Sequence, residues 1–413
     1  MIRAKANTSN RIVIPVVLIT LVTLFFPYVN VIFLFFPIQL LGKNFWLVAP
    51  MLVMLTLYLS TLFGKGRAVK RSDVILFFIA IVVGFINLSR DVLYTEPGSF
   101  LDVRYIFSPI IFILVFKRLV HGEKNANLLR VVLFTTCFIQ AILGILHAHF
   151  FSELNISFDP DSDQIAQIIF DAKRTREGGT LGASIYANII VCGMFLLIPL
   201  NDKLSSYRAS ILLIISALVM IYAISLSGSR YPMIVSGLIA LVFFARFFLN
   251  ARRRLAMLFI LITLALLLYL SIGDFEFFSI VRLDEGSGGR WGKFVLPLVL
   301  VSQNILHLFI GVPDVIVTSS FTTDGYLMSD NSYMQILTRF GLFFISVYLI
   351  CLIGILRQNI VDKLSLYFFI YFLVGLGLTN CILWEPWIFF AMLTLTILYQ
   401  NKSVNVSATS VCA

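Results

Sequence analysis

The chain of 413 residues is 60% apolar and only 13% charged, whereas a typical soluble domain is roughly a quarter charged. Because one aqueous core could not hide so much apolar surface, this composition excludes an ordinary soluble protein and predicts an all-α, polytopic integral membrane protein. The net charge of +10 does not indicate nucleic-acid binding, since the basic residues form short clusters between apolar runs, as in loops that set membrane topology.

A helix needs about 20 apolar residues to cross the hydrocarbon core of a bilayer. By this criterion, residues 1–413 form one membrane domain of about twelve spans, the first of which carries Pro27 and is long enough to kink or tilt. The predicted spans are 12–37, 45–63, 73–89, 105–119, 130–148, 183–200, 210–227, 231–249, 255–272, 335–356, 364–380 and 386–400.

Charged residues are divided unevenly between the two sides of these spans. With a cytoplasmic N-terminus, 20 of the 31 Lys and Arg residues lie on cytoplasmic segments, whereas 17 of the 21 acidic residues lie outside. The positive-inside rule therefore predicts that both termini are cytoplasmic. Two long outer loops follow from this orientation, at 149–182 and 273–334.

The segment 293–311 in the second loop is long enough to cross the membrane. Pro297 and the polar residues 302–304 interrupt its apolar run, however. We therefore favour an amphipathic helix on or near the outer leaflet. The alternative is a thirteenth span, which would move the C-terminus outside.

No metal or redox chemistry is indicated. The five cysteines form no CxxC or CxxH pair, and the four histidines show no metal-ligand spacing. We accordingly expect no metal site, no disulfide framework and no cofactor.

The first arginine cluster lies at the end of the first outer loop. The stretch RTREGGTLGASIYAN, residues 174–188, places Arg174 and Arg176 before a Gly-Gly turn that leads into a membrane helix. Guanidinium groups and the free N–H groups of a helix start suit an anion. The competing interpretation is an ordinary loop that closes with a glycine turn.

Arg230 ends an apolar helix in the sequence SLSGSRYP, where Gly228 and Pro232 bracket a tight turn. Arginine suits bidentate contact with phosphate, although an interface anchor that snorkels toward water explains such a residue as well. A basic anchor on the outer side opposes the positive-inside bias, which favours a functional role.

The second outer loop carries Arg282, then the glycine-rich run DEGSGGRWGKF at 284–294, and then His307 in the amphipathic segment. The glycines would let the backbone approach a headgroup, and Arg290 would supply positive charge. A nucleotide-binding P-loop is excluded, because the pattern GxxxxGK[ST] is missing.

The same loop re-enters the membrane at SDNSYMQILTRFG, residues 329–341. Asp330 either caps the following helix or accepts a proton from a substrate hydroxyl. Arg339 lies about two turns deeper, where a charge is costly in lipid, so we expect it to face a polar cavity. Glu385, in LWEPW, is a further and weaker candidate carboxylate.

In their order along residues 170–345, these elements resemble the bacterial O-antigen polymerases and the related O-antigen ligases. The ligases have a histidine where this chain has Asp330, so the polymerases are the closer branch. The flanking spans match only in hydropathy. The resemblance is carried by Arg176 with Gly178 and Gly179, the SGSR turn 227–230, the pair Arg290–Trp291, Asn304 with GVPD at 311–314, and DNSYMQILTRFG at 330–341.

The resemblance implies a glycosyltransferase of the bacterial inner membrane that acts in lipopolysaccharide and surface polysaccharide biosynthesis. It would join undecaprenyl-diphosphate-linked oligosaccharide repeat units at the periplasmic face, with these lipid-linked substrates, membrane lipid and a chain-length regulator as partners. Displaced diphosphate develops negative charge that preorganised arginines can stabilise. The implied catalytic residues are Arg230, Arg290 and Asp330, and the implied substrate-binding residues are Arg174, Arg176, Arg282, His307, Arg339 and Glu385.

Other functions remain open besides the ligase. A flippase or transporter for the lipid-linked repeat would have charged residues lining a path through several spans. Here the ionisable residues gather at span boundaries and in two unequal outer loops, which favours a site on one face. A membrane protein without catalysis, whose loops bind a partner, is the remaining alternative.

Overall fold

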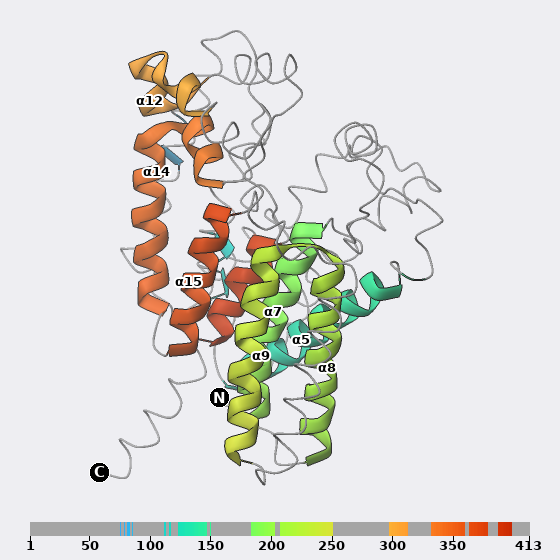
Figure 1. Cartoon of the computed structure of the whole chain (residues 1–413). Helices are drawn as coiled ribbons and strands as arrows, with labels where there is room; N and C mark the ends of the chain where they lie inside the picture. The colour runs from blue at the N-terminus through green and yellow to red at the C-terminus, as the bar shows by residue number, and fades with distance from the viewer. Residues whose placement is uncertain are drawn as a thin grey trace, which may run out of the picture.

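A computed structural model describes part of the chain, and the described part is helical throughout its regular elements, without a strand. The described residues are 75, 78, 81–82, 85, 111–112, 115–116, 123–146, 149, 183–202, 207–250, 297–312, 332–359, 363–378 and 387–398. The labelled helices in Figure 1 are α5 (Glu123–Leu146), α7 (Ala183–Asn201), α8 (Tyr207–Leu226), α9 (Arg230–Asn250), α12 (Ile305–Ile310), α14 (Ser332–Asn359) and α15 (Lys363–Leu378), and a further helix runs over Trp387–Leu398.

Most described helices begin and end within a few residues of a predicted span. The largest difference is α5, which starts at Glu123 rather than at 130, so that Arg130 lies inside the helix and is buried. Its Nη1 donates to Asn127 Oδ1 at 2.9 Å, one turn earlier. The predicted spans 12–37, 45–63 and 255–272 lie outside the described residues, and 73–89 and 105–119 are described at only a few positions.

Two of the described helices are long and apolar enough to cross a bilayer. They are Ala126–Leu146 in α5 and Ala209–Leu226 in α8. Shorter apolar helices accompany them, at Tyr186–Asn201, Tyr231–Arg246, Ile336–Ser346, Lys363–Gly377 and Trp387–Leu398.

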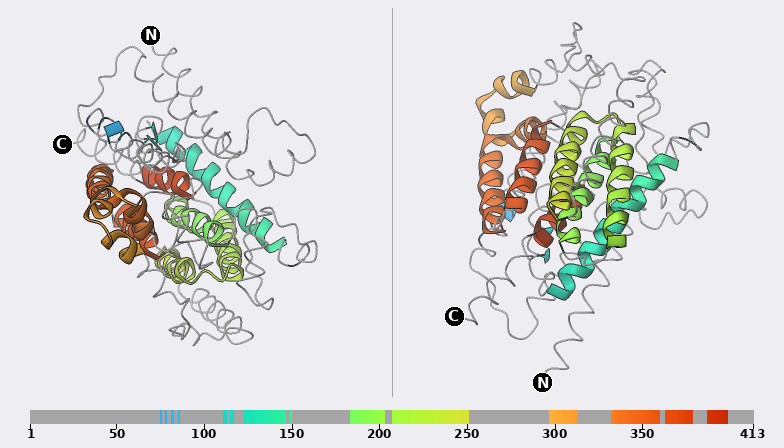
Figure 2. Two further views of the ribbon diagram at one scale, coloured as in Figure 1. Left: turned by 90° about the horizontal axis from the view of Figure 1, so that it is seen from above. Right: turned by 60° about the horizontal axis from the view of Figure 1, so that its bottom comes forward.

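Helix α7 is the centre of the packing. Its residues 186–199 are buried on every side, and α5, α8 and α9 all pack against it. Figure 2 shows α5 crossing the other helices obliquely. A helix that is apolar all round belongs in an interior. Gly193 lets α5 approach closely, since a Cβ at that position would lie 2.5 Å from Cys137 Cβ.

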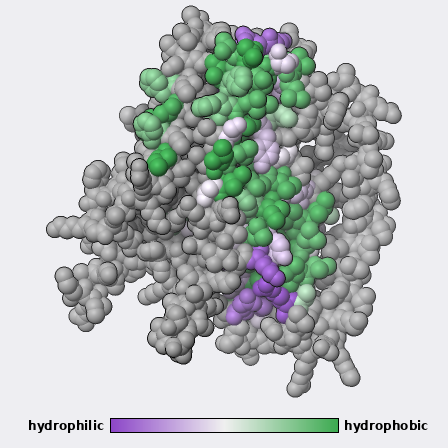
Figure 3. All heavy atoms as spheres, turned by 90° about the vertical axis from the view of Figure 1, so that its left-hand side faces the viewer, coloured by the Kyte–Doolittle hydropathy of each residue, from purple (hydrophilic) through white to green (hydrophobic). Residues whose placement is uncertain are grey.

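The outward faces of the helices are apolar as well. Leu212, Leu241 and Ile350 are 63%, 66% and 71% exposed, whereas Thr136 and Asn188 are buried. Figure 3 shows an apolar band along one side of the molecule, with hydrophilic residues at its two ends. Apolar side chains outside and hydrogen-bonded polar side chains inside are expected of helices that face acyl chains.

The helix directions bring several chain segments to one end of the bundle. Helices α7, α8 and α9 run alternately down and up, and α14 and α15 form a helical hairpin (Figure 1). The start of α7, the α8–α9 turn, the start of α14 and the end of α15 therefore share the end drawn uppermost in Figure 1. We call it the upper end.

Helix α14 covers the predicted span 335–356 but is kinked near its start, which the sequence did not predict. Gly341 has φ 75° and ψ 176° and divides α14 into a short first arm and a long second arm. Only glycine adopts this conformation readily. Arg339 thus lies about two turns along the short arm, before the kink, and is not part of the long arm of α14.

The predicted amphipathic helix at 293–311 is also broken. Residues 297–302 are helical, the chain turns at 303–304, and α12 follows. The break has a local cause, because the side chain of Asn304 caps α12 by accepting from the N–H of Leu306 at 2.9 Å. Gly311 caps the end of α12, and its N–H donates to the carbonyl of His307 at 2.9 Å.

Candidate functional site

The SGSR sequence forms the tight turn that was predicted. Ser227 Oγ donates to the carbonyl of Ile224 at 2.6 Å and accepts from the N–H of Ser229 at 3.2 Å. Gly228 adopts φ 62°, the left-handed region that suits glycine. The sequence had suggested that Arg230 ends a helix. Helix α8 instead ends at Leu226, and Arg230 is the first residue of α9.

This position matters for the charge of Arg230. A helix N-terminus carries a partial positive charge from its unpaired N–H groups, so a cation there opposes the helix dipole. An anion next to both the guanidinium and the helix start would remove that conflict. The backbone at the start of α9 thus suits an anionic ligand rather than a neutral one.

Tyr231 attaches the start of α9 to α15. Its hydroxyl donates to the carbonyl of Tyr371 at 2.7 Å. The rings of Tyr231 and Tyr371 are stacked, with centroids 5.5 Å apart and planes 11° apart. Gly375 makes room for the ring, because a Cβ there would lie 3.3 Å from Tyr231 Cε1.

Tyr371 also reaches α7. Its hydroxyl donates to Oδ1 of Asn188, and both side chains are buried. Asn188 lies in the first half of α7, shortly after the predicted Arg174–Gly179 stretch in the sequence. One tyrosine of α15 therefore connects the beginnings of α7 and α9.

Helix α14 contacts the same part of α15 through Tyr333. The Tyr333 hydroxyl donates to the carbonyl of Leu373 at 2.7 Å, and its ring lies against Gly377, where a Cβ would be 3.4 Å from Tyr333 Cε2. In Figure 1, α15 lies between α14 and α9. The beginnings of α7, α9 and α14 thus meet on the second half of α15.

Gly311 and Val312, the described part of GVPD, lie against the TRFG sequence at 338–341. The N–H of Val312 donates to the carbonyl of Thr338 at 2.7 Å. A Cβ on Gly311 would lie 2.4 Å from the carbonyl oxygen of Arg339, and a Cβ on Gly341 would lie 2.3 Å from that of Phe309. The two glycines therefore permit direct backbone contact between α12 and the kink of α14.

His307 is buried at this junction, at 8% exposure. Its Nδ1 has no hydrogen-bond partner among the residues that the structure describes. A buried polar group without a partner opposes folding by about 1–3 kcal/mol. Arg339, which is partly exposed, comes from the opposing short arm of α14.

Replacing His307 with leucine tests whether its buried, unpartnered Nδ1 opposes folding. Because leucine has no polar atoms to desolvate, His307→Leu should leave the free energy of unfolding unchanged or raise it by about 1 kcal/mol. Thermal unfolding of the detergent-solubilised protein measures that change. A marked loss of stability would contradict the reading of Nδ1 as unsatisfied.

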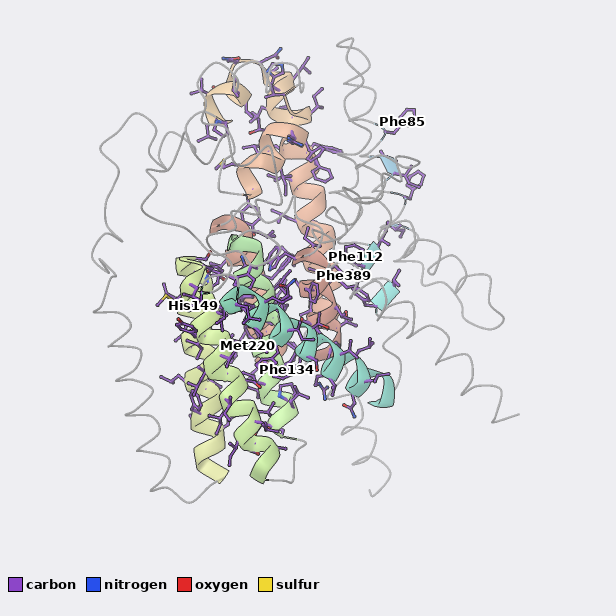
Figure 4. All side chains as sticks on the ribbon, turned by 90° about the vertical axis from the view of Figure 1, so that its right-hand side faces the viewer. Phe85, Phe112, Phe134, His149, Met220 and Phe389 are labelled. Atoms are coloured by element: carbon purple, nitrogen blue, oxygen red, sulfur yellow. The ribbon has the colours of Figure 1, made fainter. Side chains whose placement is uncertain are left out.

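The end of α5 is fixed near the upper end too. His149 Nε2 lies 2.7 Å from the hydroxyl of Tyr222, one turn before α8 ends, and the two rings are stacked. Elsewhere, Phe112 from the predicted span 105–119 packs edge-on against Phe389 at 5.3 Å, as Figure 4 shows. The first contact joins the chain after α5 to α8, and the second joins the predicted span 105–119 to the helix Trp387–Leu398; residues of α5 and of that helix belong to one apolar core.

Six of the nine predicted site residues lie outside the part of the chain that the structure describes. The side chain of Arg230 is not described, although its backbone is. The described portion of the chain holds no group of three or more His, Cys, Asp or Glu residues that could bind a metal ion. The residues that lie outside the described ranges are Arg174, Arg176, Arg282, Arg290, Asp330 and Glu385.

The sequence reading missed Tyr231, Tyr333 and the glycines of α15. Tyrosine near the end of an apolar helix is typical of the membrane interface. The sequence therefore gave no reason to expect that the two hydroxyls bond to distant carbonyls. The pair Gly375 and Gly377 in an otherwise bulky helix was the available signal, because small residues mark close helix contacts in membranes.

No family model, curated protein or solved structure matches the chain.

Proposed function

We propose that this protein is a polytopic inner-membrane glycosyltransferase that joins undecaprenyl-diphosphate-linked oligosaccharide repeat units at its periplasmic face, as an O-antigen polymerase does. The twelve-span topology with cytoplasmic termini belongs to the same proposal. It starts from the resemblance of residues 170–345 to that family.

One observation carries the proposal beyond sequence. Segments that the resemblance singles out are far apart in the chain, yet the helices that follow them meet on α15. Asn188 of α7 and Tyr231 of α9 both bond to Tyr371, and Tyr333 of α14 bonds to Leu373. A catalytic site built from several loops requires this kind of convergence.

The chemistry follows from the proposed substrates. A hydroxyl of the acceptor sugar attacks the anomeric carbon of the donor glycan, the bond from that carbon to the diphosphate oxygen breaks, and the diphosphate leaves with its lipid. Asp330 would take the hydroxyl proton. Arg176, Arg230 and Arg290 would stabilise the charge that develops on the leaving diphosphate, most strongly where little water is present.

The decisive experiment uses purified protein in vesicles with lipid-linked repeat units. Formation of lipid-linked products longer than one repeat supports the polymerase. Transfer only to lipid A–core would indicate a ligase, and movement of substrate across the bilayer without joining would indicate a flippase. A deletion strain provides the matching test in cells, because loss of a polymerase leaves one repeat attached whereas loss of a ligase leaves none.

The membrane topology has its own test at Ile215, which is 49% exposed on α8. On a water-facing surface, lysine at this position would change stability by about 0.5 kcal/mol or less. In the middle of a span it disfavours insertion by roughly 3 kcal/mol. Ile215→Lys should therefore lower the amount of protein inserted in the membrane, whereas Ile215→Phe should not. Equal insertion of both variants would contradict a lipid-facing α8.

A further inference from the structure

The feature on which this inference rests is the contact between α9 and α15. Three side chains form a continuous chain of contacts, from Tyr231 through Tyr371 to Asn188. The Tyr231 hydroxyl bonds to the Tyr371 carbonyl at 2.7 Å, the two rings stack, and the Tyr371 hydroxyl bonds to Asn188. The contacts join α9, α15 and α7.

Arg230 is the residue directly before Tyr231, and it lies between the turn residue Ser229 and this anchor. On its other side, the turn is held by the bonds of Ser227 with Ile224 and Ser229. Gly228 in this turn has the backbone freedom of glycine, so the turn depends on these bonds to stay fixed. Without the Tyr231 hydroxyl, the start of α9 would be held mainly by apolar packing, which does not fix direction.

We propose that Tyr231 is a positioning residue for Arg230, and that its hydroxyl bond to α15 fixes the direction in which the guanidinium meets the anionic group of the substrate. This inference rests on the proposed function for its substrate, a lipid-linked diphosphate. Tyr231 does not touch the reacting atoms. It acts through the backbone at the start of α9.

A bidentate guanidinium is more sensitive to orientation than an ammonium group. Arginine contacts phosphate through a rigid, planar fork, whereas lysine carries a point charge on a flexible stem. A small displacement of a catalytic group can lower a rate by up to about 100-fold. The orientation provided by Tyr231 should therefore matter when residue 230 is arginine and matter little when it is lysine.

Double substitution tests this dependence. In the vesicle assay, Tyr231→Phe keeps the ring and removes the hydroxyl, and we expect kcat to fall about tenfold with little change in KM. In an Arg230→Lys background, the same change should lower kcat less than about twofold. Tyr367→Phe is the matched control, since Tyr367 lies on α15 with its side chain exposed, and it should have no effect in either background.

A spectroscopic measurement supplies a readout that does not depend on activity. A nitroxide attached at Ser229→Cys, in protein whose five native cysteines are replaced with alanine, reports on motion at the α8–α9 turn. Tyr231→Phe should raise the mobility of the nitroxide in its electron paramagnetic resonance spectrum, and Tyr367→Phe should not.

Each outcome decides one of the two proposals. An equal loss of kcat from Tyr231→Phe in both backgrounds, or an unchanged nitroxide spectrum, overturns the positioning role. Wild-type protein that joins no repeat units overturns the proposed function instead, and the nitroxide spectrum then still decides whether Tyr231 fixes the start of α9. Greater mobility together with the background-dependent loss of kcat supports both.

Discussion

Replacing Arg230 with alanine is expected to leave the protein in the membrane but to produce surface glycans that stop at one repeat unit. Arg230 begins α9 at the upper end of the bundle, where its charge adds to that of the helix N-terminus. Removing one preorganised group that stabilises developing negative charge lowers a rate by about 100- to 1,000-fold. Joining of repeat units would then be slower than the transfer of single units to lipid A–core, so most glycans would carry one repeat.

The same helix provides a control for this prediction. Arg246 lies near the other end of α9, is exposed, and pairs with Asp202 at 3.5 Å. An exposed ion pair contributes little to stability, so Arg246→Ala should preserve both the amount of protein and the chain-length profile. The measurement is the distribution of glycan lengths on gels, at matched protein levels. Long chains of normal distribution from Arg230→Ala would refute its assignment as a catalytic residue.

Much of the helical architecture could be predicted from the sequence because hydropathy alone determines which segments avoid water. The boundaries of α7, α8 and α9 differ from the predicted spans by three residues or fewer. The tight turn at Gly228 was equally accessible, since glycine between serines after an apolar run is a local signal. Such features depend on the chain close to them in sequence.

The kink of α14, unlike the locally capped break before α12, depends on contacts between distant segments. Leu337 and Val312 belong to a small separate apolar cluster, and that packing holds α12 against the bend at Gly341. In the sequence, Gly341 is one glycine within a long apolar run, and glycine inside a helix is tolerated. The attachment of Tyr231 to Tyr371 is of the same kind, because nothing within α9 specifies a carbonyl 140 residues away.

The second large effect is expected at that kink. Gly341→Ala places a Cβ 2.3 Å from the carbonyl oxygen of Phe309, and it forces a side chain onto a backbone with φ 75°. The conformational strain opposes folding by about 1–3 kcal/mol, and overpacking against backbone atoms that cannot rotate away adds about 1–3 kcal/mol. Gly311→Ala should have a similar effect, since its φ is 88° and its Cβ would lie 2.4 Å from the carbonyl oxygen of Arg339.

Gly354 in the long arm of α14 makes the comparison specific, because a Cβ there meets nothing within 4 Å. Gly354→Ala should leave stability unchanged or raise it by up to about 1 kcal/mol, as alanine is the better helix former. Thermal unfolding in detergent compares the three variants directly. If Gly341→Ala and Gly354→Ala unfolded at the same temperature, the close contact of α12 with the kink would be wrong. A loss confined to Gly341→Ala and Gly311→Ala would instead show that two glycines 30 positions apart in sequence hold the α12–α14 junction together.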